Sequence, residues 1–127
     1  MKCLSVRQPW ASLIVTGLKD VENRSWKPGY RGRILIHAGA GMRVSDLDYL
    51  AEKYGIELDP SSLVIGAILG AVDLIDCKKK VSSRWHRRGQ VGWYFANPRR
   101  LRSPIPYKGQ LGLFEVPDRL LPKSWRD

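Results

Sequence analysis

The sequence lacks any long apolar run. Nowhere in its 127 residues does it approach the roughly 18 uninterrupted apolar residues of a membrane helix. Lys2, Arg7 and Gln8 interrupt the apolar positions near the start, which excludes the continuous core of a secretory signal there. We therefore expect no membrane association and a cytoplasmic protein, or a nuclear one if its cell has a nucleus.

Cysteine is scarce as well, with Cys3 and Cys77 the two examples. Their spacing and the lack of neighbouring histidines exclude a zinc finger, and two cysteines do not make a disulfide framework. Acidic residues, histidines and cysteines nowhere show the spacing of metal ligands. We expect reduced, at least partly buried thiols, and neither a metal nor another cofactor.

Acidic residues are few, since 12 of them against 22 lysines and arginines leave a formal net charge of +10. The basic residues cluster in three runs, over 78–80, 84–88 and 99–102. Such runs attract a polyanion through counterion release and field focusing, and Trp85 within the second run could stack on an unpaired base. A solvated basic loop is the alternative, but three separate runs favour nucleic acid as the partner.

The organisation of the chain predicts one domain over 1–127, because its length suits a single core and it has no repeats or linkers. The pattern predicts strands over 3–6, 33–38, 63–76, 92–96 and 111–116, helices over 9–15 and 45–54, a loop over 105–110 and a surface tail over 118–127. Strands that alternate with helices in this way predict a small α+β domain, built on a curled or barrel-like sheet of about five or six strands with two or more flanking helices.

The segment 17–26, Gly-Leu-Lys-Asp-Val-Glu-Asn-Arg-Ser-Trp, carries the best clue to function. Gly17 follows the first predicted helix, and the chain then enters a strand. In a straight strand Lys19 and Glu22 would face opposite sides, so they can meet only if the chain bends, which Gly17 permits. An ordinary surface ion pair, which stabilises little, is the alternative interpretation.

Four stretches together resemble the ASCH domain family. They are residues 3–14, the Gly-x-Lys-x-x-Glu-x-Arg-x-Trp motif that begins at Gly17, the Arg-Gly-Arg at 31–33, and residues 70–76. The resemblance covers most of the chain, and the motif is its most specific part. It implies a PUA-like fold, which is a small β-barrel with helices at its sides and a cleft beside the first helix.

The resemblance also implies a nucleic-acid-related ligand, although the family is divided in function and fold alone does not choose among its activities. Some members resemble binding modules, some are reported to cut single-stranded RNA, and some are small amidohydrolases that act on acylated cytidine. Lys19 would be catalytic in the amidohydrolases, but Glu22 stands where that branch has a threonine, with Asp73 and Asp76 the available second acids. A basic surface of this extent favours a polymer over a free nucleoside.

For binding, we predict a basic cleft around Lys19 and Glu22. Guanidinium groups hold phosphate oxygens and tryptophans stack on bases of any identity. Trp10 could instead belong to the core, and Arg24 could be a structural partner of Glu22. The predicted nucleic-acid-binding residues are Arg7, Trp10, Arg24, Trp26, Lys27, Arg31, Lys78, Lys79, Lys80, Arg84, Trp85, Arg87 and Arg88.

Metal-independent cleavage of single-stranded RNA is the leading enzymatic alternative. It needs a base for the ribose 2′-hydroxyl and a stabiliser for the charged phosphorane. Lys19 and Glu22 are the predicted catalytic residues, while His37 and His86 are other candidate bases or structural histidines. Binding of RNA or another single-stranded nucleic acid remains the first prediction, with no obligate protein partner.

Overall fold

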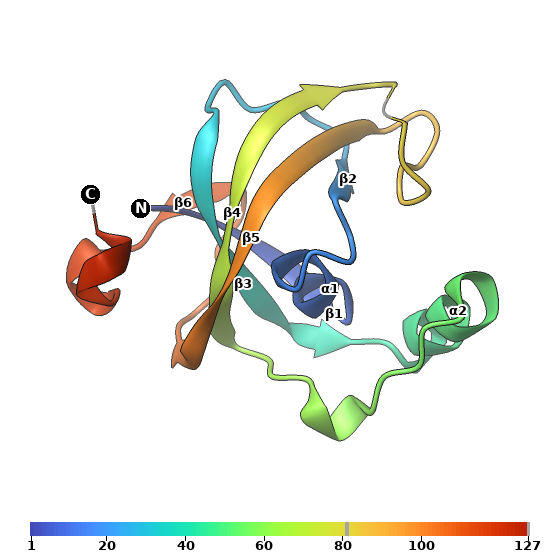
Figure 1. The fold of residues 1–127 in the computed structure, drawn as a ribbon, viewed down its shortest axis with the longest axis horizontal. Helices are drawn as coiled ribbons and strands as arrows, with labels where there is room; N and C mark the ends of the chain where they lie inside the picture. Colours follow the sequence, from blue (N-terminus) through green and yellow to red (C-terminus); the bar gives the residue numbers. More distant parts are fainter. Residues whose placement is uncertain (81, 127) are drawn as a thin grey trace.

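The computed structural model describes residues 1–80 and 82–126, and its main feature is one curled six-stranded sheet (Figure 1). The strand order is β2-β5-β4-β3-β1-β6, and every neighbouring pair is antiparallel except the parallel pair of β1 and β3. The strands are β1 (Lys2–Gln8), β2 (Val21–Arg24), β3 (Gly32–Met42), β4 (Ala67–Lys78), β5 (Val91–Pro106) and β6 (Leu113–Glu115).

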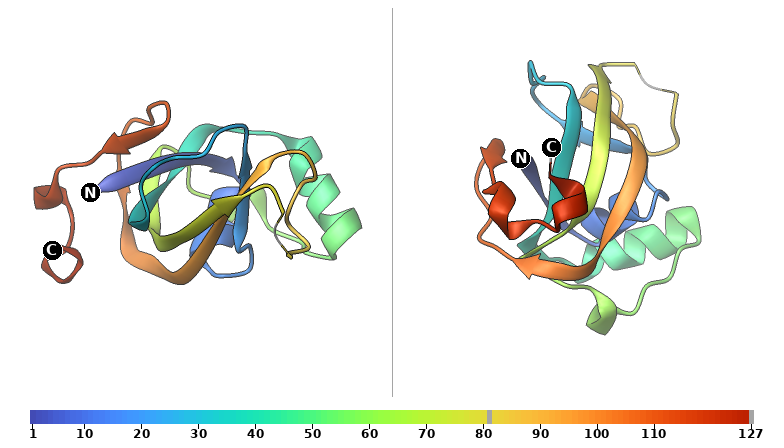
Figure 2. Two further views of the ribbon diagram at one scale, coloured as in Figure 1. Left: turned by 90° about the horizontal axis from the view of Figure 1, so that it is seen from above. Right: turned by 60° about the vertical axis from the view of Figure 1, so that its left-hand side comes forward.

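Two α-helices accompany the sheet, α1 (Trp10–Val15) and α2 (Val44–Tyr54), with 3-10 turns at Pro60–Ser62, Asp118–Leu120 and Lys123–Trp125. Helix α1 lies within the curl of the sheet, whereas α2 stands outside it (Figures 1 and 2). Helix α2 ends at Gly55, as predicted, with a left-handed φ of 68°. None of the helices in the described ranges has both the length and the apolar character required to cross a bilayer.

The predicted α+β class and curled sheet are confirmed, but the expected barrel is not closed. The short strands β2 and β6 form the two edges, and each pairs along one side, β2 with β5 and β6 with β1. These edge strands have four and three residues, and they do not pair with each other in the described sheet.

Both faces of the sheet are covered, which explains the continuous apolar run in β3. Ile34 and Ile36 pack beneath α1, while Leu35 points to the opposite face, as alternation along a strand requires. Leu121 and Trp125 cover that opposite face and are 2% and 6% exposed. The prediction of a surface tail over 118–127 is therefore wrong for these residues, because the sheet's second face needs an apolar cover; Asp127 lies outside the described residues.

Strand β5 is longer than the sequence predicts, since it continues from Val91 through Asn97 and Pro98 to Pro106. Asn97 has a positive φ of 51°, and the register with β4 shifts between Ala71 and Asp73. Such a bulge lets a proline stand within a strand, because the local ladder is already interrupted. The expected strand end at Asn97–Pro98 is therefore wrong.

The two thiols are free and buried, as the sequence predicts. Cys3 lies in the core beneath the C-terminal turns, and burial raises the pKa of its thiol to about 12. Burial also raises the pKa of Cys77. Neither thiol is a reactive group of the kind that serves as a catalytic nucleophile.

Candidate functional site

The segment before β2 bends as the sequence requires for its charges to meet. The Lys19 backbone N–H donates to the Leu13 carbonyl at the end of α1, at 3.0 Å, and Gly17 has a φ of 88°. Since β2 begins only at Val21, Lys19 stands outside the strand. Its side chain can therefore fold back toward Glu22 instead of pointing to the opposite face.

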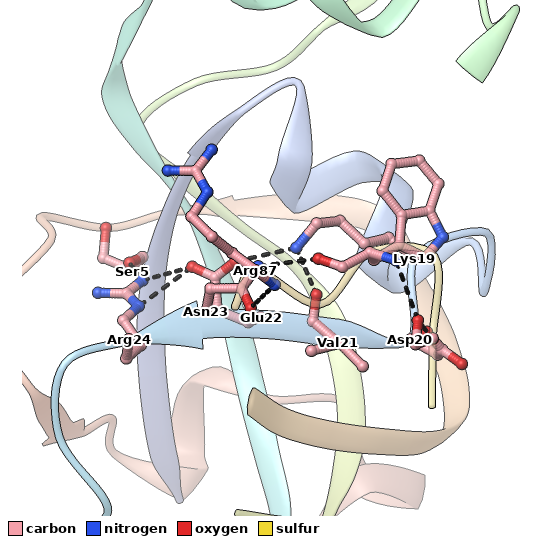
Figure 3. A network of polar contacts seen from close by, with 10 residues as sticks. Ser5, Lys19, Asp20, Val21, Glu22, Asn23, Arg24 and Arg87 are labelled. Atoms are coloured by element: carbon pink, nitrogen blue, oxygen red, sulfur yellow. Dashed lines mark hydrogen bonds and ion pairs between the residues drawn. The ribbon is translucent and has the colours of Figure 1, made fainter. Parts of the chain in front are cut away.

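Glu22 holds two cations, one with each carboxylate oxygen (Figure 3). Lys19 Nζ lies 3.1 Å from Glu22 Oε1 and also donates to the Val21 carbonyl. Arg24 Nε donates to Glu22 Oε2 at 3.1 Å, and Arg24 Nη2 donates to the Ser5 carbonyl at 2.8 Å. Lys19 is only 5% exposed. Its ammonium is therefore held inside the protein by a carboxylate and a carbonyl.

The segment 82–90, here called the basic loop, is tied to β2 through Asn23 (Figure 3). The Asn23 amide donates to the Trp85 carbonyl at 2.9 Å and accepts from the Arg87 N–H at 2.8 Å. A second tether joins Ser83 Oγ to Asp20 Oδ1 at 2.7 Å. Asp20 and Asn23 occupy the variable positions of the motif, so the same ten residues that position Lys19 also position the loop.

Four aromatic rings join the basic loop to the helices. Trp85 is 6% exposed and stacks on Tyr54, with ring centroids 4.1 Å apart. Its ring also meets Trp10 edge-on at 6.5 Å, and it packs with the buried Leu13 of α1 and Leu50 of α2. Trp85 therefore anchors the loop in the protein and does not offer the free face expected of a stacking residue.

Tyr49 is the most accessible of the four rings, with 40% exposure. Its edge meets Trp10 at 6.4 Å, and its hydroxyl accepts a 2.9 Å hydrogen bond from Lys53 one turn later on α2. That hydrogen bond lowers the pKa of Tyr49 and raises the pKa of Lys53. Tyr49 presents a ring that a ligand can cover.

These elements enclose a hollow of about 630 Å³, here called the cleft. Its lining includes six cationic and two acidic side chains, so its charge is strongly positive. The cations are Arg7, Lys19, Arg43, Lys53, Arg87 and Arg88, the acids are Glu22 and Asp46, and the aromatic residues are Trp10, Tyr49, Tyr54 and Trp85. Within the ranges described, no three His, Cys, Asp or Glu side chains come close enough together to hold a metal ion.

The structure brings only some of the predicted site residues together. The cleft contains Lys19 and Glu22 with the predicted binding residues Arg7, Trp10, Trp85, Arg87 and Arg88. Arg24 bonds to Glu22 but is not part of this lining; it lines a second cavity, the one beside His37. The lining does not include Trp26, Lys27, Arg31, Lys78, Lys79, Lys80 or Arg84.

Several of these outlying residues have partners elsewhere. Trp26 meets Trp93 edge-on at 4.8 Å. Arg31 donates to the carbonyls of Pro28 and Tyr30, and the Arg84 guanidinium lies over the Trp85 ring, 4.9 Å from its centroid. Asp73 and Asp76, the acids available for an amidohydrolase, also lie outside the lining.

His37, a predicted candidate base, is buried beside a second cavity of about 570 Å³. Its Nε2 lies 2.7 Å from the Tyr107 carbonyl and its Nδ1 lies 2.9 Å from Ser5 Oγ. Because a carbonyl only accepts, Nε2 donates to it, and in the neutral ring Nδ1 accepts from the serine hydroxyl. Both ring nitrogens are satisfied, as the structural interpretation of this histidine expects.

Helix α2, predicted from the sequence only as a helix over 45–54, also contributes to the cleft. Arg43, immediately before the helix, and Asp46, Tyr49 and Lys53 all line the cleft. Tyr49 and Lys53 are four residues apart and therefore share one helix face. This polar and aromatic face lies opposite the apolar face of the helix, and it is the feature of the sequence that could have predicted a role for the helix in the cleft.

Comparison with known proteins shows which family the chain resembles. The family profile of the ASCH domain matches residues 4–121. Activating signal cointegrator 1 of Homo sapiens is 35% identical and that of Mus musculus 34% identical, each over 132 residues and 93% of this chain. The chain spans only 22% of the length of either relative.

A solved structure gives independent support for the fold. The crystal structure of ASCH from Zymomonas mobilis superimposes with a TM-score of 0.56, covering 94% of this chain and 89% of the other. Sequence identity is 14%, so the likeness concerns the fold alone.

Proposed function

Because this chain belongs to the ASCH domain family, we propose that it binds nucleic acid, and specifically single-stranded RNA, through the cleft. The observation that carries the proposal is the lining of the cleft, where six cations and four aromatic rings meet from four separate parts of the chain. A positive groove with rings for stacking is the common design of proteins that bind single strands.

The exposed cations suit the phosphate backbone. Arg43, Lys53, Arg87 and Arg88 are exposed at the cleft, and Arg7 retains 47% exposure beside Asp46. Their guanidinium and ammonium groups can hold phosphate oxygens and displace counterions. Lys19 and Arg24 are already bound to Glu22, so they contribute a fixed field more than new contacts.

The size and rings of the cleft suit a base. A volume of about 630 Å³ lies within the range of pockets that hold small ligands, about 300–1,000 Å³. Tyr49 offers an exposed ring for stacking. Further exposed cations outside the cleft, in 78–80 and 99–102, favour a polymer over a free nucleoside.

The test is fluorescence anisotropy with a short labelled single-stranded RNA over a series of salt concentrations. We expect binding that weakens steeply with salt. The double variant Arg87→Ala/Arg88→Ala should lower the slope of log K against log salt by about two, one for each phosphate contact. Gel analysis of the same mixtures, with and without a chelator, scores cleavage by the wild type and by Lys19→Ala.

The matched control is Arg100→Ala/Arg102→Ala, which removes the same charge from exposed positions of β5 away from the cleft. Its slope should stay close to that of the wild type. Equal losses in the two double variants would show that RNA is attracted by net charge without using the cleft. Absence of binding at low salt would overturn the proposed function.

A further inference from the structure

Two buried acceptor atoms in the cleft have no hydrogen-bond partner. Among the described side chains, Asp46 Oδ2 and His86 Nδ1 are the buried nitrogen or oxygen atoms left in this state, and both residues line the cleft. Buried polar groups are nearly always hydrogen-bonded, so each exception calls for a physical reason. Their location in one hollow points to a ligand.

Asp46 stands in the first turn of α2. Arg7 Nη2 lies 3.6 Å from Asp46 Oδ2. At this distance the two charges attract each other, but the atoms are too far apart for a hydrogen bond. The carboxylate therefore has neighbouring positive charge and still has lone pairs free. A donor in the cleft can bind this oxygen when the carboxylate turns toward it, and no hydrogen bond of the oxygen has to be displaced.

His86 belongs to the basic loop, on the other element that closes the cleft. Its Nε2 lies 2.7 Å from the Lys79 carbonyl, which can only accept, so the ring donates from Nε2. In the neutral imidazole Nδ1 is then an acceptor. The wall of the cleft thus holds two buried acceptors, one on α2 and one on the loop, and no described partner occupies either.

We propose that Asp46 and His86 read the amino group of an unpaired base, so that the cleft selects amino-bearing bases over uracil. This inference rests on the proposed function. Cytosine, adenine and guanine each carry an exocyclic N–H₂ donor, and a carboxylate is the natural acceptor for the amino group of cytosine. Uracil places a carbonyl where cytosine has that group. The uracil carbonyl oxygen and the protein acceptor would then face each other, and neither would have a hydrogen-bond donor.

A metal cation at the same atoms is disfavoured by their surroundings. Arg7 lies against Asp46, and the other lining cations raise the positive potential of the cleft. A neutral amino group brings the donors without adding a full positive charge. A nucleotide therefore suits both features of the cleft: its phosphates bind the arginines, and the amino group of its base donates to the free acceptors.

The test compares three labelled RNAs that differ at one central position. One is all uridine, one has a central cytidine, and one has a central pyrimidin-2-one ribonucleoside, which lacks the amino group and puts no carbonyl in its place. We expect the wild type to bind the cytidine RNA on the order of tenfold more tightly than the uridine RNA. The pyrimidin-2-one RNA should fall between them.

Asp46→Asn should abolish or reverse this preference, because the amide brings N–H donors that suit the uracil carbonyl. Asp48→Asn is the matched control, since it removes the same charge from an exposed position of the same helix outside the cleft lining. It should keep the wild-type preference. His86→Ala should weaken the preference, and a thermal melt of each variant shows whether it is folded.

Equal affinity of the wild type for the three RNAs would overturn the inference, as would a preference that survives in Asp46→Asn. Salt-dependent binding without a base preference would leave the proposed function intact and remove only this selectivity. Failure to bind any of the three RNAs at low salt would overturn both.

Discussion

Two groups of side chains line the same cleft and differ in what holds them. Lys19 and Glu22 of the motif, with Trp85, are bound into the protein: the charges are paired with each other, and the tryptophan is packed between two helices. Tyr49, Arg87 and Arg88 are exposed at the same hollow. The first group builds the cleft, whereas the second is available to a ligand.

This difference separates the most specific sequence motif from the residues that contact a ligand. The Gly-x-Lys-x-x-Glu-x-Arg motif supplies an internal ion network and, through Asn23, the support of the basic loop. Changes in the motif should therefore act mainly on stability or loop order. Changes at the exposed residues should act on binding and leave the fold intact.

Among changes to the charged and the exposed side chains of the cleft, the largest effect is expected from Glu22→Gln. The substitution keeps the shape but removes the anion that neutralises Lys19 and Arg24, of which Lys19 is almost wholly buried. Removing one partner of a buried pair leaves an uncompensated charge. We expect a loss of about 3 kcal/mol in the free energy of unfolding, measured by urea denaturation.

The control for that measurement is Glu115→Gln, which removes an exposed carboxylate that pairs with Lys2 at 2.9 Å and with the N-terminal amine at 3.4 Å. Its effect should be about 1 kcal/mol or less. If the two variants lose similar stability, the motif is an ordinary surface pair and the distinction between the two groups disappears.

Tyr49→Ala should produce the second-largest effect, and it should appear in binding. Stacking of a base on an aromatic ring contributes about 1–3 kcal/mol, so affinity for single-stranded RNA should fall on the order of tenfold. The free energy of unfolding should change little, because Tyr49 is 40% exposed.

Two further variants sharpen this comparison. Tyr49→Phe keeps the ring and loses only the bond from Lys53, so it should bind nearly as the wild type does. Trp85→Ala should instead unfold more easily, because it empties a buried site. A Tyr49→Ala variant with unchanged affinity would remove the tyrosine from the ligand-binding group.

The sequence predicted the fold class, the charged motif and the basic runs, because each depends on local pattern. The sequence predicted that Lys19 could reach Glu22 only if the chain bends at Gly17. The structure has this bend, and the hydrogen bond from the Lys19 N–H to the Leu13 carbonyl holds it. The course of β5 was not predictable in this way. Its bulge at Asn97 depends on pairing with β4, and local sequence contains only the proline that signals a stop.

The composition of the cleft was harder still, because it depends on where distant elements meet. Trp85 in a basic run reads as a stacking residue, but Tyr54 and Leu50 of α2 cover it. From the sequence, Asp46 and Tyr49 belong to a surface helix. In the structure that helix faces the basic loop, and both residues line the cleft. Burial and exposure at such a junction are properties of the tertiary structure, so the sequence predicts its charge better than its contacts.

The smallest of these effects concerns Asn23, which links the two groups. Asn23→Ala removes the amide that donates to the Trp85 carbonyl and accepts from the Arg87 N–H, while the ion network of Glu22 stays intact. Two lost hydrogen bonds at a half-buried site predict about 1–2 kcal/mol, chiefly as local opening of the loop. Trypsin should therefore cut after Arg87 or Arg88 faster than in the wild type, and RNA affinity should fall modestly.

Ser82→Ala, at an exposed position of the same loop, should be cut at the wild-type rate. If Asn23→Ala resists trypsin as the wild type does, Trp85 alone holds the loop. The motif would then not determine the position of the exposed arginines.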